Sequence, residues 1–257
     1  MGRGSSGTGA CYRVRVNPRT KDLYGGQDPR EVPTYSVAEA AHLAQLPVTT
    51  LAHWVAGQPY VAKGGERRHS PPLIEVHKGA PRLLSFANLV EAFVLADIRR
   101  QHGVSFPKLR RAVKYVSETM HVARPLINVR FQTDGTDLFV EKVGTLVNVS
   151  QQGQIEIRSA LAGRLKRIEW DKQGIAVRLF PLPRAGAPAA EQPRSIVIDP
   201  RRGFGKTVVA GTGISTVIIA ERHRAGDSVK DLAEDYRLTP ELIEDAIRFE
   251  YRYRAAA

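Results

Sequence analysis

The first strong pattern in the chain begins at Tyr35, where small apolar residues recur at helical spacing. Ser36, with Glu39 three positions later, makes a capping-box pattern, and alanines follow at the offsets of one helix face. Residues 45–47 interrupt the pattern with a proline, and residues 48–55 resume it before a glycine and a second proline end it. The sequence predicts two short helices joined by a tight turn.

The same domain is expected to continue to residue 122. A Gly-rich, charged loop at residues 63–69 is followed by two strand-like runs, residues 73–77 and 81–84, spaced as the strands of a β-hairpin would be. Ser85 is a favourable cap for a third helix, and residues 109–120 carry the apolar stripe of a fourth. We therefore predict the order helix, turn, helix, hairpin, helix, helix for residues 35–122.

The hydrophobic period changes after Pro125. Six short runs rich in β-branched and aromatic residues are typical of strands, and Asp134-Gly135, Gln152-Gly153 and Gln173-Gly174 are typical of turns. The runs are residues 126–131, 138–141, 146–149, 155–158, 168–170 and 176–180. We predict a β-rich middle domain over residues 123–183, with one short helix at 159–166. Four prolines in residues 181–193 then indicate a linker, placed at 184–194.

The last segment, residues 195–257, returns to a helical pattern. It opens with an extended run at 195–199 and a Gly-rich loop at 203–213, and three helices are expected at 217–224, 228–236 and 240–253. The prediction for the whole chain is an α+β fold with an N-terminal helix–turn–helix domain, a β-rich middle and a C-terminal three-helix, homeodomain-like unit.

Composition narrows the class of protein. A chain of 257 residues has room for about two cores, and no apolar run is long enough for a membrane helix, so a cytoplasmic protein is expected. The net charge is +12, and residues 1–125 hold 18 Lys and Arg against 9 Asp and Glu. Residues 1–34 are expected to form a flexible basic arm. Excess positive charge beside a helix–turn–helix pattern favours nucleic acid as a partner.

Residues 35–120 resemble the winged DNA-binding domain of MerR-type regulators. The resemblance is carried by residues 35–41 in the first helix, 50–54 in the second, Leu84-Ser85 at the start of the third, and 99–109 before the fourth. It implies that the second helix enters the major groove and that a wing reaches the DNA backbone. The implied DNA-binding residues are Thr49, Thr50, His53, Lys63, Arg67 and Arg68.

Two limits apply to that resemblance. The alternative interpretation is structural: Thr49 would be a helix cap, Trp54 a core residue, and Arg67 and Arg68 part of a solvated loop. MerR-type proteins also continue into a long dimerisation helix, whereas Arg124-Pro125 here leads into predicted strands. A metal- or drug-sensing role is therefore not implied.

The Gly-rich loop of the last segment does not fit a nucleotide-binding motif, because Pro200 and Val208 stand where glycines are required. Residues 195–250 instead resemble the domain of unknown function 433 found in antitoxins, through 198–201, 205–214, 232–236 and 238–241. The whole layout resembles a VapB-type antitoxin of mycobacterial kind. The resemblance implies a VapC toxin, a PIN-domain ribonuclease, as partner.

The charge of the C-terminal unit qualifies its role. Its last helix begins with glutamates and an aspartate, which would oppose DNA phosphates, so a protein contact is expected there. The expected toxin or dimer contacts are Leu242, Ile243, Ile247, Arg248, Tyr251 and Arg252. A second DNA contact remains open at Arg201, Arg202, Lys206, Arg222 and Arg224. Arg248, Arg252 and Arg254, interleaved with aromatic residues, are either a toxin-binding tail or an ordinary C-terminus.

No catalytic, cofactor-binding or metal-binding arrangement stands out. The seven histidines lack metal-ligand spacing, the single Cys11 has no partner, and no nucleophile–base pattern is present. The sequence therefore favours a non-enzymatic protein without cofactors: a homodimeric antitoxin that represses its own operator. The alternative is a stand-alone DNA-binding regulator without a toxin.

Overall fold

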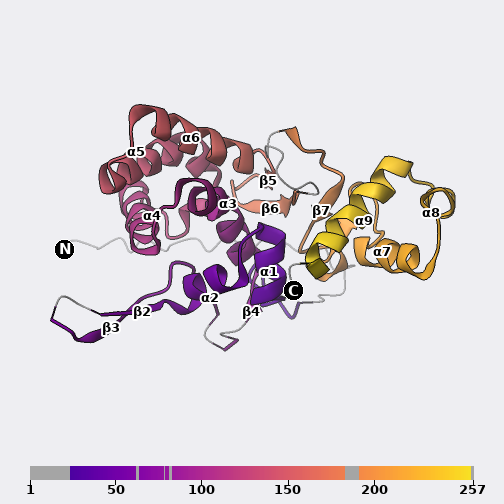
Figure 1. The fold of residues 1–257 in the computed structure, drawn as a ribbon, viewed down its shortest axis with the longest axis horizontal. Helices are drawn as coiled ribbons and strands as arrows, with labels where there is room; N and C mark the ends of the chain where they lie inside the picture. The colour runs from indigo at the N-terminus through magenta and orange to yellow at the C-terminus, as the bar shows by residue number, and fades with distance from the viewer. Residues whose placement is uncertain (1–23, 62–63, 78, 81–82, 183–190, 256–257) are drawn as a thin grey trace, which may run out of the picture.

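Helices dominate the chain, and short strands join them. The computed structural model describes residues 24–61, 64–77, 79–80, 83–182 and 191–255. The projecting hairpin and the bundle of α4, α5 and α6 occupy one end, strands β5 to β7 lie in the middle, and three C-terminal helices form the other end (Figure 1). In the described residues the strands form two two-stranded sheets and one four-stranded sheet.

The predicted pair of N-terminal helices is present. Helix α1 spans Val37–Ala44 and helix α2 spans Val48–Ala56. The capping box is formed as predicted, since the Ser36 hydroxyl accepts from the Glu39 amide and the Glu39 carboxylate accepts from the Ser36 amide. Leu51 and Trp54 are buried against the rest of the domain, so the opposite face of α2 points outward.

The hairpin is present but not where the sequence placed it. Strands β2 (Gln58–Val61) and β3 (Arg67–Ser70) form it, directly after α2. The run expected at 73–77 is not a strand, because the Leu73 and Ile74 amides donate to the Trp54 carbonyl at the end of α2. In the expected second run, residues 83–84 form β4 (Leu83–Leu84), which pairs with β1 (Tyr35–Ser36), and residues 81–82 lie outside the described residues.

Gly57 is required at the junction of α2 and the hairpin. Its φ is +80°, and a Cβ there would lie 2.1 Å from the Ser70 carbonyl oxygen. Gly57→Ala is expected to lower the free energy of unfolding by about 1–3 kcal/mol from backbone strain alone, because L side chains rarely adopt this conformation. Urea denaturation measures the change. Gly64→Ala is the matched control, since a Cβ at Gly64 meets nothing within 4 Å; equal stability of the two variants would contradict the assignment.

The middle of the chain is a helical bundle, so the predicted β-rich domain is wrong for most of its length. After α3 (Phe86–His102) and α4 (Phe106–Met120), a 3-10 turn at Pro125–Ile127 and a π-helical turn at Phe131–Gly135 lead into α5 and α6. Helix α5 spans Thr136–Val147 and α6 spans Gln151–Leu165. Of the six predicted strands, only β5 (Ile168–Trp170) and β6 (Ala176–Leu179) exist.

Close helix packing explains this error. A Cβ on Gly135 would lie 2.8 Å from the Phe131 ring and 2.9 Å from the Met120 sulfur, and one on Gly144 would lie 2.8 Å from Gln154. These glycines let α5 approach its neighbours; the turn that was expected at residues 134–135 is part of a continuous helical segment. The buried residues of α6 are spaced by four, at Ile157, Leu161 and Leu165, which is a helical period.

A four-stranded antiparallel sheet joins the bundle to the C-terminal unit. Its order is β5-β6-β7-β8, where β7 spans Ile196–Ile198 and β8 spans Thr207–Val209. The predicted linker lies between β6 and β7, and its residues 184–190 fall outside the described residues. The buried Arg167 donates to backbone carbonyls on both sides of the undescribed stretch, namely those of Phe180, Pro181, Gln192 and Pro193. Burial, with Arg194 and Arg164 nearby, lowers the pKa of Arg167 to about 10.

The three C-terminal helices are present as predicted. They are α7 (Thr216–Ala225), α8 (Val229–Tyr236) and α9 (Pro240–Ala255), preceded by a 3-10 turn at Gly203–Gly205. Ser228 and Asp231 make a capping box for α8. The helices pack around their own apolar core, which contains Val209, Ile219, Leu232, Ala233, Ile243, Ala246 and Ile247.

Side chains from both ends of the chain meet along α1. The Tyr35 hydroxyl donates to the Gly205 carbonyl at 2.7 Å, and the Lys206 ammonium lies 3.5 Å from the Glu39 carboxylate. Burial raises the pKa of the Tyr35 hydroxyl, with a smaller contribution from the Glu39 carboxylate. The C-terminal unit is therefore fixed against the first helix of the N-terminal domain.

Residues 24–34 also lie against this body. Arg30 pairs with Asp171 at 2.7 Å, and the Tyr24 hydroxyl donates to the Pro200 carbonyl. The predicted flexible arm is therefore wrong for these residues, and its residues 1–23 lie outside the described part. Among the described residues, no helix has the length and apolar character that crossing a membrane requires.

Candidate nucleic-acid interface

The outward face of α2 presents short polar side chains beside a helix start that no side chain caps. Thr49 and His53 are exposed one helical turn apart, and Thr50 is half-buried. The N-cap is Pro47, so the alternative interpretation of Thr49 as the cap is wrong, whereas Trp54 is a core residue as that interpretation held. The first turn contains no acidic residue. Backbone N–H groups at such a helix end can receive a phosphate oxygen.

The hairpin formed by β2 and β3, which we call the wing, carries Arg67 and Arg68. Tyr60 pairs with Arg68 and Val61 with Arg67 across the two strands, so the two arginines lie on opposite faces. Arg68 lies 2.8 Å from the Glu66 carboxylate and both remain well exposed, whereas Arg67 has no ion pair among the described residues. Lys63, the third predicted wing contact, lies outside the described residues.

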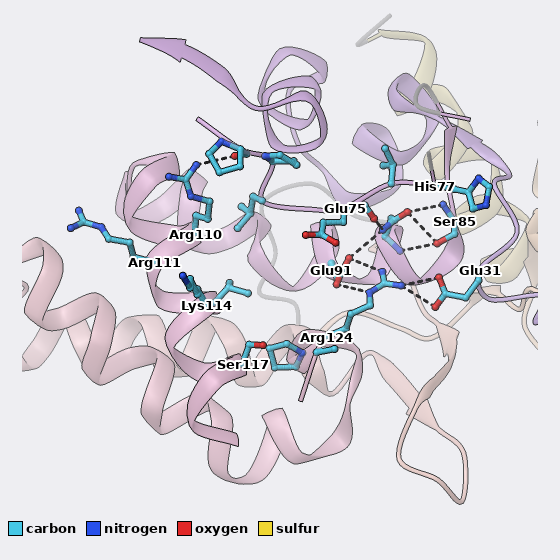
Figure 2. Close-up of a pocket in the computed structure, with 18 residues that line it drawn as sticks. Glu31, Glu75, His77, Ser85, Glu91, Arg110, Arg111, Lys114, Ser117 and Arg124 are labelled. Carbon is cyan, nitrogen blue, oxygen red and sulfur yellow. Dashed lines mark hydrogen bonds and ion pairs between the residues drawn. The ribbon is translucent and has the colours of Figure 1, made fainter. Parts of the chain in front are cut away.

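Helix α4 adds cations that the sequence interpretation missed. Arg110, Val113, Lys114 and Ser117 follow at the spacing of one helix face and line a groove of about 770 Å³ with Arg111. Arg110 donates to the carbonyl of Pro71, the residue that follows the wing strand, so α4 lies beside the base of the wing. Figure 2 shows these side chains along one wall of the groove. Guanidinium and ammonium groups in this position suit phosphate oxygens.

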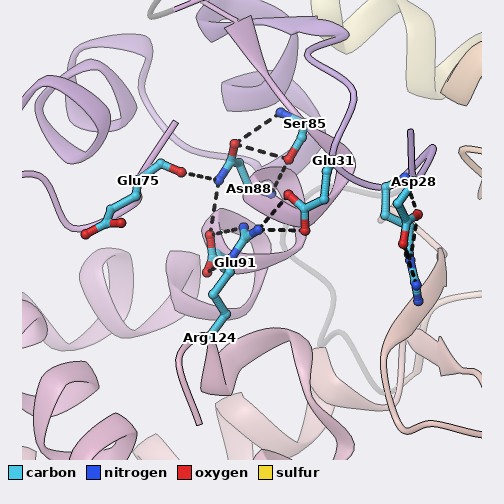
Figure 3. Close-up of polar contacts among 8 residues, drawn as sticks. Asp28, Glu31, Glu75, Ser85, Asn88, Glu91 and Arg124 are labelled. Carbon is cyan, nitrogen blue, oxygen red and sulfur yellow. Dashed lines mark hydrogen bonds and ion pairs between the residues drawn. The ribbon is translucent and has the colours of Figure 1, made fainter. Parts of the chain in front are cut away.

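The opposite wall of the groove is acidic and tied together by hydrogen bonds. Arg124 donates to Glu91 at 2.7 Å and 3.0 Å and pairs with Glu31 at 2.8 Å (Figure 3). The Asn88 amide continues the network, bonding Glu91 and the backbone carbonyl of Glu75. Desolvation opposes the charge on Arg124, but the two carboxylates outweigh it and raise its pKa. The α4 wall is therefore the side of this groove that can face DNA.

The residues predicted to form a second DNA contact lie in separate parts of the C-terminal unit. Arg201 and Arg202 are exposed in the turn after β7, and Lys206 is paired with Glu39. On α7, Arg222 is held by Asp227 at 2.6 Å and Asp235 at 2.7 Å, and Arg224 lies over the Tyr251 ring. Thr207, which follows Lys206, contacts Thr216 at the start of α7. Arg224 comes eight residues after Thr216, about 12 Å along the helix, so it lies at the opposite end of α7 from Lys206. These cations do not form one patch.

The expected protein contacts on α9 are only partly on the surface. Ile243 and Ile247 are buried in the C-terminal core, so their side chains are not available to a partner, and Leu242 is half-buried. Arg248 is exposed but pairs with Asp245 and Glu244. Tyr251 is exposed, while Phe249, an aromatic residue of the proposed tail, is buried. The side chains of Arg252 and Arg254 lie outside the described residues.

In the described residues, no group of three or more His, Cys, Asp or Glu side chains is placed to hold a metal ion. Around the base of the wing the structure brings the exposed cations of the wing and of the α4 wall close together, next to the polar face of α2.

Comparison with known proteins places these features in a family. Residues 33–113, which contain α1 to most of α4, match the family described as "Putative DNA-binding HTH domain". Residues 196–249 match "Protein of unknown function (DUF433)". The "Uncharacterized protein Rv2308" of Mycobacterium tuberculosis is 30% identical over 88% of this chain and 93% of its own length. This chain belongs to the Rv2308 family.

Two further matches cover most of this member of the Rv2308 family. A Mycobacterium tuberculosis protein named "Putative antitoxin VapB45" is 27% identical over 84% of the chain and 93% of its own length. The X-ray crystal structure of Rv2018 from the same organism superposes with a TM-score of 0.62 and 27% identity, covering 84% of this chain and 98% of that one. The helix–turn–helix domain and the C-terminal domain are therefore found together in related proteins.

Proposed function

We propose that this protein is an antitoxin that binds operator DNA to repress its own operon and neutralises a VapC-type PIN-domain ribonuclease. The observation that carries the proposal is the set of cations on the wing and α4 beside the polar face of α2, within a matched DNA-binding domain. The related protein named as an antitoxin, aligned over 84% of the chain, supports the second half.

In the proposed complex, α2 lies in the major groove and its side chains Thr49, Thr50 and His53 face base edges or phosphates. Arg67 and Arg68 of the wing, with Arg111 and Lys114 of α4, contact the phosphate backbone on either side. These backbone contacts carry affinity, and α2 carries sequence preference.

The proposed operator-bound form is a homodimer. Two copies related by a twofold axis would place two α2 helices on half-sites about 10 base pairs apart, and the operator would be an inverted repeat. A footprint that covers a single half-site would contradict the dimer while leaving DNA binding intact.

DNA binding is tested by fluorescence anisotropy with a labelled fragment of the promoter upstream of this chain's gene. Specific binding should exceed binding to a scrambled fragment of equal length by at least about 10³-fold and should weaken steeply with added salt. Equal affinity for both fragments would contradict operator recognition.

Toxin neutralisation is tested by co-expressing the chain with a PIN-domain protein encoded beside its gene. The proposal expects a stable complex and loss of the partner's ribonuclease activity in that complex. A DNA-binding chain that neither binds nor inhibits such a partner would instead be the stand-alone regulator.

A further inference from the structure

A small apolar pocket lies where the C-terminal unit meets α1. It has a volume of about 90 Å³, and its walls include Leu43 of α1, Val217 of α7 and Phe249 of α9. Glu39, Lys206 and Glu250 provide the charged groups that line it. A pocket of this size accommodates one side chain of a partner.

Two exposed apolar side chains on α7 lie next to this pocket. Val217, which lines the pocket, is 40% exposed, and its neighbour Ile218 is 51% exposed. Glu221 follows Val217 by four residues and Ile218 by three, so it lies on the same side of the helix. Apolar side chains next to a pocket and bordered by charge are typical of a protein-binding surface.

The net charge of the C-terminal helices α7 to α9 indicates which kind of partner this surface favours. The three helices of this unit, residues 216–255, contain nine acidic and seven basic side chains, a net charge of −2 in a chain of net charge +12. Three of the basic residues, Arg222, Lys230 and Arg248, are paired with carboxylates of the unit itself. DNA is therefore disfavoured here, and a positively charged surface is favoured.

We propose that Val217, Ile218 and the adjoining pocket form the docking surface for the ribonuclease toxin, which inserts an apolar side chain flanked by basic ones. This rests on the proposed function. A ribonuclease has to attract RNA phosphates, so it presents a basic surface that complements this acidic unit. A twofold contact between two copies at this surface would bring two negative units together, so a second copy is not the proposed occupant.

The experiment measures binding of the purified chain to the PIN-domain protein encoded beside its gene, by biolayer interferometry. Val217→Ala with Ile218→Ala is expected to weaken binding roughly tenfold or more, as truncation of a central interface anchor does. Ile155→Ala is the matched control: Ile155 is 53% exposed but lies on α6, and its truncation should leave binding unchanged. Both variants should keep the wild-type melting curve, because the side chains removed are on the surface.

Charge is tested separately. Glu221→Lys is expected to slow association at low salt and to reduce its dependence on ionic strength, as removal of complementary charge does. Unchanged affinity of the double variant would overturn the assignment of this surface while leaving the proposed function in place. Failure of the wild-type chain to bind the PIN-domain protein would overturn both, and altered self-association of the double variant would assign the surface to a second copy instead.

Operator binding by the double variant tests whether the proposed toxin-binding site is independent of the proposed DNA-binding site. The double variant should bind the promoter fragment as tightly as the wild type, because the surface of α2, the wing and α4 is untouched. Loss of DNA binding together with toxin binding would indicate a general structural defect and would overturn the proposal.

Discussion

Asp97→Ala is expected to lower the free energy of unfolding by about 3–5 kcal/mol, because it leaves a positive charge without a partner in the core. The Arg164 side chain is 0% exposed and donates to both oxygens of Asp97, at 2.8 Å and 2.7 Å. Removing one member of such a pair leaves the desolvation cost of the other in place, without the attraction that offset it.

The effect should be large because Arg164 joins three helices. It extends from α6 to Asp97 on α3, its guanidinium lies 4.4 Å from the Phe93 ring centre, and it donates to the Ala44 carbonyl at the end of α1. Loss of Asp97 therefore disturbs the attachment of the helix–turn–helix to the bundle as well as the bundle itself.

Urea denaturation followed by circular dichroism measures the change. Glu234→Ala is the control, since it breaks an exposed i, i+4 pair with Lys230 that should contribute about 0.5 kcal/mol or less. Replacing both members, Asp97→Leu with Arg164→Met, should recover much of the stability because no buried charge remains. A loss below about 1 kcal/mol for Asp97→Ala would show that the pair is hydrated in solution.

Arg67→Ala with Arg68→Ala is expected to weaken operator binding and to reduce the salt dependence of the binding constant. Each phosphate that the protein no longer neutralises should lower the slope of log K against log salt by about 0.9, so the slope for the double variant should fall by about 0.9 for each of the two arginines that contacts a phosphate. The decrease in affinity is larger at low salt than at high salt. Unchanged affinity and slope would remove the wing from the mechanism.

The same measurement on Arg111→Ala with Lys114→Ala tests the α4 wall independently. A control with an equal change of charge is Arg130→Ala with Lys172→Ala, which removes two exposed cations near the turn between β5 and β6 rather than on the DNA-facing surface. An equal effect of all three pairs would show that net charge, rather than position, governs binding.

Local signals in the sequence were sufficient for the helices at both ends of the molecule. The capping residues Ser36, Ser85 and Ser228 and the proline at position 240 mark helix starts that the structure contains. Caps and apolar periodicity act over three or four residues, so they can be interpreted without knowing what the helix packs against.

The middle of the chain shows where local signals fail. Its β-branched residues and Gly-containing pairs are typical of strands and turns, but tertiary packing decided otherwise: Gly135 and Gly144 allow close helix packing that no local pattern reveals. The wing was misplaced for a different reason. All four residues of β2 are exposed, so this strand carries no alternating apolar pattern to detect.

The candidate site was only partly accessible from sequence. Thr49, His53 and Arg67 could be proposed from sequence because they lie on elements with recognisable order, whereas Arg111 and Lys114 enter the candidate site only through the packing of α4 beside the wing. Ile243 and Ile247 were taken as surface contacts, although their spacing of four within α9 is that of a buried stripe.

The hydrogen bond from Tyr35 to Gly205 connects the start of α1 to the loop beside the proposed toxin-binding pocket. Tyr35 directly precedes the cap of α1, and Gly205 directly precedes Lys206 at the pocket below α7. Thermodynamic linkage is reciprocal, so whatever factor a protein ligand at that pocket imposes on promoter affinity, the promoter imposes on that ligand. Occupancy of one proposed site would then be detected as a change in affinity at the other.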